Sequence, residues 1–371
     1  MNIFIYLREL REQRSGLVTS QDHYKLAYSL LEEHLTLGFT ARSVTDFLTE
    51  SVTDMRLAEE FDKVNQVRPE MTQGDCAGAH REENQNKNRS ILVLPPDKNR
   101  PYITSFQGND CTDYINAVFV DGYSRLNELI VTEWPLSDTI KNFWSMVWDH
   151  EAVTVVVLSN PRSSYKYPEF WPKVGKPQKY GPVFSLEQVE VEKEDTDMSK
   201  EVSAADIEYA DLIDKTDSYT SVRLHICKKE VAPHRKTQSL YVDDKQSHKM
   251  SALTNLVSRV GVSLPARRCH ILQINSVDTD PAVLAKMMRA ARAWQTSEKP
   301  GGSPTIVVSS DGVTGAGVWC GAALAWDMAN REGSVDIAHA VRSIRISRPG
   351  LVTSLGEYAM TRELVTRLVH T

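Results

Sequence analysis

The sequence lacks any long hydrophobic run. Its longest, residues 152–158, has seven residues and includes Thr154, whereas a helix that crosses a bilayer needs about 20 apolar residues. No basic stretch followed by an apolar run opens the chain, so a signal peptide is not expected. We therefore predict that this chain contains no membrane segment.

The sequence also lacks an excess of positive charge. Lys and Arg together number 43 against 49 Asp and Glu, which gives a formal net charge of −6. Binding to nucleic acid needs a basic face that neutralises phosphates, so we expect no nucleic-acid partner. Apolar residues make up 41% of the chain, which is enough for a packed core and excludes a disordered or collagen-like protein.

Paired cysteines and clustered metal ligands are absent too. The five cysteines are scattered without a CxxC pair, and the ten histidines form no HxH or HxxxH pair. Scattered cysteines of odd number indicate reduced thiols and not a disulfide framework. Because metal sites need ligands at characteristic short spacings, we predict neither a metal nor another cofactor.

A repeat connects the two ends of the sequence. The segment Arg14–Ser20 recurs as Arg348–Ser354, with Gly-Leu-Val-Thr-Ser unbroken in both copies. Each copy is predicted as helix, short loop, helix, because a glycine stands where the first periodic segment must end. Chance similarity between two amphipathic hairpins is the alternative. We interpret residues 1–38 as the C-terminal helical tail of a preceding homologous domain, and residues 39–371 as a second domain.

The remaining segments alternate between helical and strand-like patterns. Helices are predicted at 41–68, 137–150 (with Ser137 as N-cap), 282–295 and from Val318 onwards. Strands are predicted at 91–94, 102–106, 114–120, 126–131, 153–158 and 305–308. This mixture indicates an α/β (α+β) domain, in which a twisted mixed sheet is flanked by helices.

The glycine-rich loop 309–317 lies between a predicted strand and a predicted helix. This arrangement can hold a phosphate, because loop amides and the helix N-terminus both favour an anion. The loop lacks the lysine of GxxxxGK[ST], which excludes a nucleoside triphosphatase. Its GxxGxG order is also not that of a dinucleotide-binding loop.

Seven short motifs are shared, in the same order and spacing, with a known family. They are Lys87-Asn88-Arg89, Asp113–Ala117, Asp121-Gly122-Tyr123, Thr132–Leu136, Phe143–Trp148, Phe170-Trp171-Pro172 and Arg348-Pro349-Gly350. In these motifs the sequence resembles the receptor-type protein tyrosine phosphatases, which carry two phosphatase domains in tandem inside the cell. The resemblance covers nearly all of residues 40–371. It implies a protein-tyrosine-phosphatase-like, highly twisted mixed sheet, and a membrane-distal second domain on the cytoplasmic side of the plasma membrane.

The positions that carry chemistry in that family are altered here. The resemblance places Ser309 where the family has its nucleophilic cysteine, and Gly315 where it has the arginine that grips the phosphoryl group. Further altered positions are the acid loop at Ile274, Asn275 and Ser276, the phosphotyrosine-loop position Ser90, and the water-positioning site Thr353. Asp278 and Asp280 are the nearby carboxylates, shifted in register.

These alterations predict a catalytically inactive domain that acts as a regulatory or scaffolding module in phosphotyrosine signalling. Its expected partners are the first phosphatase domain of the same or another receptor, and signalling proteins. The acidic stretch 187–217 and the basic stretch 223–236 are either docking patches or ordinary solvated surface. Two alternatives remain: a residual tyrosine phosphatase, or a phosphate- or phosphopeptide-binding module that uses the loop 310–317. The loop candidates for anion binding are Ser310, Asp311, Gly312, Val313, Thr314 and Gly315.

Overall fold

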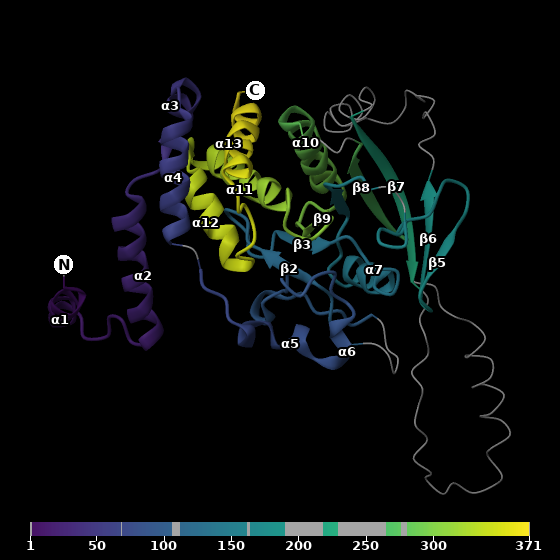
Figure 1. Cartoon of the computed structure of the whole chain (residues 1–371), viewed down its shortest axis with the longest axis horizontal. Helices are drawn as coiled ribbons and strands as arrows, with labels where there is room; N and C mark the ends of the chain where they lie inside the picture. Colours follow the sequence, from purple (N-terminus) through teal and green to yellow (C-terminus); the bar gives the residue numbers. More distant parts are fainter. Residues whose placement is uncertain are drawn as a thin grey trace, which may run out of the picture. The chain divides into compact units, whose positions relative to one another are not determined.

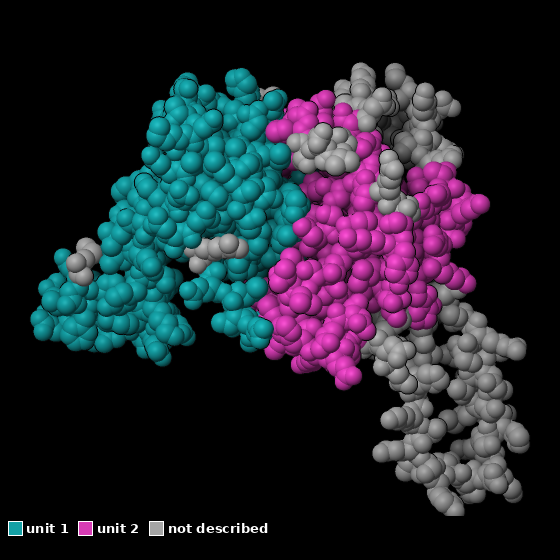
Figure 2. Space-filling view, in the orientation of Figure 1, with its two compact units in different colours: residues 1–75, 120–126, 313–371 teal, residues 76–119, 127–312 magenta. Residues whose placement is uncertain are grey.

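The computed structural model divides into two compact units, which are coloured separately in Figure 2. The first unit comprises residues 1–75, 120–126 and 313–371, and the second comprises residues 76–119 and 127–312. The structure describes residues 2–67, 69–105, 112–161, 164–189, 218–228, 265–275 and 280–370. Most of the acidic stretch 187–217 and the end of the basic stretch 223–236 lie outside these described residues.

An eight-stranded sheet organises the second unit, in the order β2-β3-β9-β4-β8-β7-β6-β5 (Figure 1). Strands β3, β9, β4 and β8 pair in parallel, whereas β8, β7, β6 and β5 pair antiparallel. The strands are β2 (Ala117–Val120), β3 (Leu129–Glu133), β4 (Thr154–Val157), β5 (Gln178–Tyr180), β6 (Phe184–Val189), β7 (Tyr219–Lys228), β8 (Arg267–Ile274) and β9 (Thr305–Ser309). The mixed sheet predicted from the sequence is confirmed.

The central strands are buried on both faces, as their continuous apolar sequences predict. All of β3 and all of β4 are buried. Two predicted strands are wrong, since residues 91–93 form a turn and residues 102–105 are irregular. In both segments β-branched and aromatic residues suggested a strand, but their proline-flanked backbone does not join the sheet.

Several helices complete the second unit. They are α5 (Ala77–His80), α6 (Glu82–Gln85), α7 (Ile140–Asp149) and α10 (Pro281–Glu298), with the short 3-10 turn η2 (Asp97–Asn99). A further 3-10 turn, η1 (Gln73–Cys76), lies where the chain passes from the first unit into the second. Trp144 on α7 is fully buried, and its indole N–H donates to the carbonyl of Phe170 at 2.7 Å. The predicted cap Ser137 is wrong, because α7 begins after Thr139, which makes no side-chain cap.

The first unit is mainly helical. Its elements are α1 (Ile3–Gln13), α2 (Gln21–Leu37), α3 (Val44–Thr49), α4 (Asp54–Gln66), α11 (Ala316–Glu332), α12 (Ile337–Ser347) and α13 (Leu355–Val369), with a two-stranded sheet of β1 (Arg42–Ser43) and β10 (Ser334–Val335). The single helix predicted at 41–68 is thus two helices. Figure 1 shows α12 and α13 beside α11.

The two ends of the chain fold into the same local structure, as the sequence repeat predicts. Arg14 and Arg348 end their helices with nearly identical backbone angles (φ −148° and −147°). Val18 and Val352 both have a positive φ, 56° and 54°. The match at these unusual conformations shows that α1–α2 and α12–α13 are two copies of one helical hairpin.

An arginine holds the loop of each hairpin in the same way. Arg11 Nε donates to the Leu17 carbonyl at 3.0 Å, and Arg345 Nε donates to the Leu351 carbonyl at 3.1 Å. The surroundings of the two copies differ, because Arg345 is 1% exposed whereas Arg11 is exposed to solvent. The guanidinium of Arg345 also donates to the Val64 carbonyl at 3.4 Å and lies 5.6 Å from the centre of the Phe61 ring.

This pair of arginines allows a matched prediction. We expect Arg345→Ala to lower the free energy of unfolding by about 2–4 kcal/mol, because it strands buried carbonyls that have no access to water. Arg11→Ala removes the same local bonds at the surface and should cost less than about 1 kcal/mol. Urea unfolding of the whole chain measures both, and equal losses would contradict the burial argument.

Candidate functional site

Ser309, which the resemblance predicts at the nucleophile position, ends strand β9 and is fully buried. Its hydroxyl donates to Asp311 Oδ1 at 3.3 Å and accepts the amide of Gly312 at 3.0 Å. The hydroxyl therefore acts as a local brace for the start of the loop. A serine needs an adjacent base to become a nucleophile. The charged side chain that the Ser309 hydroxyl contacts is the Asp311 carboxylate, which lies at the edge of hydrogen-bond range.

Two amides at the start of the loop, those of Ser310 and Gly312, donate to hydroxyl groups. The amide of Ser310 donates to Ser159 Oγ at 2.9 Å, and the amide of Gly312 donates to Ser309. An incoming anion would have to replace both bonds. Ser159, which directly follows Leu158 after strand β4, was not predicted from the sequence.

The end of the loop, which lies in the first unit, is held by a carboxylate. Gly315 is the N-cap of α11, and its amide donates to Glu357 Oε1 at 3.1 Å. The other oxygen, Oε2, accepts the amide of Thr353 at 2.9 Å. Glu357 thus joins two of the predicted site residues. It was not predicted, although the Ser354-x-x-Glu357 capping-box pattern marks it in the sequence.

Gly315 has a backbone that suits glycine and not arginine. Its φ is +72°, in the left-handed region that residues with a side chain rarely adopt. A Cβ placed there meets no atom of the described residues within 4 Å, so the space for a side chain is open. Conformation, and not crowding, therefore opposes an arginine at this position.

The residues predicted for the acid loop are structural where the structure describes them. Ile274 is the buried last residue of β8. The Asn275 side-chain oxygen accepts from Thr220 Oγ1 at 2.7 Å, and its carbonyl accepts from Asn160 at 3.0 Å. Ser276 and Asp278 lie outside the described residues.

The carboxylate of Asp280, which also lies near this loop, caps a helix. Asp280 is the N-cap of α10, and its Oδ1 accepts the amide of Ala282 at 2.8 Å. Its side chain therefore serves the helix in this conformation.

The segment around Ser90 is fixed by its neighbours. Arg89 Nε donates to the Trp134 carbonyl at 2.7 Å, and its guanidinium lies 4.7 Å from the centre of the Tyr167 ring. Partial burial lowers the pKa of Arg89 from its usual value. Ser90 Oγ accepts the amide of Leu92 at 3.1 Å. The position thus carries a small turn-forming side chain and offers no aromatic ring to a substrate.

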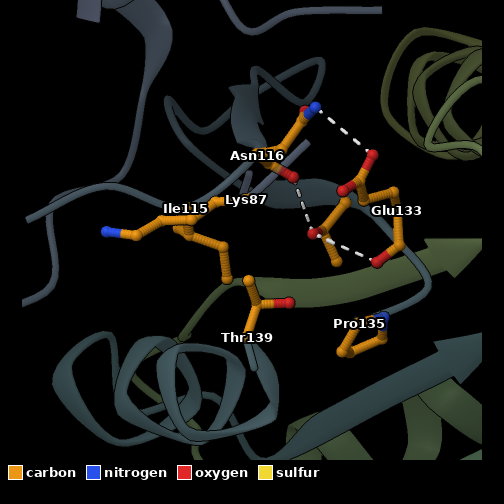
Figure 3. Close-up of a pocket in the computed structure, with 7 residues that line it drawn as sticks. Lys87, Ile115, Asn116, Glu133, Pro135 and Thr139 are labelled. Carbon is orange, nitrogen blue, oxygen red and sulfur yellow. Dashed lines mark hydrogen bonds between the residues drawn. The ribbon is translucent and has the colours of Figure 1, made fainter. Parts of the chain in front are cut away.

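Figure 3 shows a small pocket in the second unit. It is lined by Lys87, Ile115, Asn116, Thr132, Glu133, Pro135 and Thr139. Asn116 donates to Glu133 Oε2 at 3.3 Å, and Glu133 also accepts the amide of Arg89 at 3.1 Å. Figure 3 shows the Lys87 amine pointing away from Glu133. The hydrogen bonds of Asn116 and Glu133 connect segments of the backbone around the pocket. None of the polar groups that line it is a nucleophile beside a base.

The reactivity of the Cys320 thiol provides a test of where the structure places the loop and the helix that follows it. It lies on α11 just after the loop and is fully buried, and burial raises the pKa of its thiol. Because the thiolate is the reactive form, we expect Cys320 to resist a thiol reagent in the native protein, whereas the partly exposed Cys227 is modified faster than Cys320. Peptide mass spectrometry after timed labelling gives both rates, and equal rates would contradict this.

Comparison with known proteins identifies the fold. Residues 84–255 and 268–367 match the family described as protein-tyrosine phosphatase. Human receptor-type tyrosine-protein phosphatase alpha is 24% identical over 383 aligned positions, which cover 100% of this chain and 40% of that protein. Human receptor-type tyrosine-protein phosphatase epsilon is 23% identical over 98% of this chain and 47% of that protein. Tyrosine-protein phosphatase 99A of Drosophila melanogaster is 34% identical over 48% of this chain and 13% of that protein.

The chain spans less than half the length of each of these relatives. Over the residues that the structure covers, no helix is both long and apolar enough to cross a membrane.

Proposed function

The chain belongs to the protein-tyrosine phosphatase family, and we propose that it is a catalytically inactive domain of a receptor. It would act as a regulatory or scaffolding module in phosphotyrosine signalling, on the cytoplasmic side of the membrane. The observation that carries this proposal is the pair Ser309 and Gly315, which stand where the resemblance expects a thiolate and an arginine.

The chemistry supports the proposal at each step. Attack on phosphorus needs an ionised nucleophile, and the Ser309 hydroxyl lies in a brace with Asp311 and Gly312. The charge that develops on the phosphoryl oxygens needs a cation, which Gly315 cannot supply. Protonation of the leaving group needs a free acid, whereas the Asp280 side chain caps α10.

The test is hydrolysis of a generic aryl phosphate and of a phosphotyrosine peptide by the purified chain. We expect no turnover above the buffer rate. Turnover that depends on Ser309 would favour the alternative of a residual phosphatase and would overturn the proposal.

The first hairpin supports a tandem arrangement. Apolar side chains on α1 and α2 are exposed, whereas their counterparts in the second hairpin are buried: Leu10 is 46% exposed against 1% for Ile344, and Leu30 is 55% exposed against 0% for Leu364. A face of this kind is a typical interaction surface. Residues 1–38 are therefore proposed to complete a preceding phosphatase-like domain, with residues 39–371 as the second domain.

The same hairpin is also fixed to the second domain. Glu33 on α2 forms an ion pair with Arg342 on α12 at 2.8 Å. A preceding first domain that includes residues 1–38 would thus lie next to the second domain. That position supports the proposal that the second domain regulates it. Other signalling proteins remain proposed partners.

A further inference from the structure

Glu357 differs from its counterpart in the other hairpin in a way that the hairpin itself does not require. The first copy has His23 at this position. In both copies the backbone amide of the residue donates to the capping serine, at 3.1 Å to Ser20 and 3.2 Å to Ser354. Because the copy with histidine keeps the same cap and the same loop conformation, the hairpin fold does not need an acid here.

The two side chains also reach different places. His23 Nδ1 lies 3.4 Å from Thr19 Oγ1, a contact within its own hairpin. The half-buried Glu357 carboxylate instead extends to the amide of Gly315, in addition to that of Thr353 within its hairpin. Glu357 therefore ties the second hairpin to the first residue of the turn that starts α11.

One of the two groups that Glu357 binds, the amide of Gly315 at the start of α11, is of the kind that attracts an anion. The amides at a helix start have no partner within the helix, and the helix dipole makes them favour negative charge. With both carboxylate oxygens bound, these amides are already paired to a negative charge. An external phosphate would have to break both bonds and would meet the charge of the carboxylate itself.

We propose that Glu357 is an internal anion that closes the end of the 309–315 loop to phosphate. The inference rests on the proposed function and deepens it, since it gives the reason why a loop without catalytic groups is also not a phosphate-binding loop. Any regulatory action of the domain would then depend on other surfaces.

The experiment compares the whole chain with Glu357→His and Glu357→Gln at about pH 8, where a histidine is mostly neutral. Glu357→His places the residue of the first hairpin in the second, so the hairpin fold is retained. Inorganic phosphate is titrated while the amide resonances of Gly315 and Thr353 are followed by NMR. Thermal unfolding without phosphate serves as the control for folding.

We expect the native chain to show no saturable change at these amides up to about 10 mM phosphate. Glu357→His should show saturation at the amides of Gly315 and Thr353. Its Kd for phosphate should be at least about tenfold lower than the limit of about 10 mM expected for the native chain. Its melting temperature should rise with phosphate, as for any ligand that binds the folded state alone. Glu357→Gln, which keeps one acceptor oxygen without the charge, should lie between the two.

Two results would overturn the inference: saturable phosphate binding at these amides in the native chain, or no gain of binding in a folded Glu357→His. Neither readout depends on turnover. A failure of the internal-anion inference is therefore distinguishable from a failure of the proposed inactivity, which only the hydrolysis assay reports.

Discussion

The variant Ser309→Cys is expected to hydrolyse an aryl phosphate no faster than the native chain, which itself stays at the buffer rate. A thiolate alone leaves the phosphoryl charge without an arginine, and such an arginine is worth about 10³–10⁵ in rate in related phosphoryl transfer. Loss of the covalent nucleophile costs about 10⁶ in the rate of a serine protease, an enzyme of a different class. Because residues of this kind act as a unit, repair of one gains little.

The double variant Ser309→Cys/Gly315→Arg tests the backbone argument. The left-handed φ of +72° at residue 315 opposes a side chain. We therefore expect the hydrolysis rate of this variant also to remain far below that of a phosphatase with all of the family's catalytic groups. Initial rates at saturating substrate are compared with Ser309→Ala. Turnover that survives Ser309→Ala and disappears with Asp280→Asn would show that the catalytic parts lie elsewhere.

Gly317→Ala is expected to destabilise the fold more than other glycine substitutions on α11. A Cβ at this position would lie 2.6 Å from the amide nitrogen of Val352 and 3.1 Å from the carbonyl carbon of Leu351. Backbone cannot give way as a side-chain tip can, and overpacking of this kind costs about 1–3 kcal/mol or more. We expect a net loss of about 2–3 kcal/mol in urea unfolding, after the helix-propensity gain of about 1 kcal/mol.

Gly321→Ala on the same helix is the matched control. Its Cβ would meet a methyl group of Thr361 at 3.3 Å and one of Ile344 at 3.6 Å, and these contacts can relax. Since alanine also favours a helix, the change in stability should stay within about 1 kcal/mol of zero. A Gly317→Ala variant as stable as Gly321→Ala would show that the second hairpin does not press against the start of α11.

Features with a local cause were predictable from the sequence. The buried run at residues 154–157 is a central strand because continuous β-branched residues have few other stable arrangements. The helix, short loop, helix form of the repeat was predicted correctly. In both copies the C-cap of the first helix lies two residues before the glycine, and the second helix begins after a capping serine. The wrong predictions, strands at 91–94 and 102–106 and a cap at Ser137, concern short signals that neighbouring segments override.

The sequence by itself determined the family, the mixed sheet and the repeat, because each depends on which residue stands at which position. It also predicted that Ser309 and Gly315 stand at the positions of the nucleophile and of the phosphate-gripping arginine. Only the tertiary structure decided what those residues do instead. Glu357 lies 42 positions after Gly315, and its bond to that amide forms because α13 packs against α11. Likewise, Arg11 and Arg345 make the same local hydrogen bonds, and burial alone separates their roles. Contacts between distant segments depend on the packing of whole elements, which no local pattern encodes.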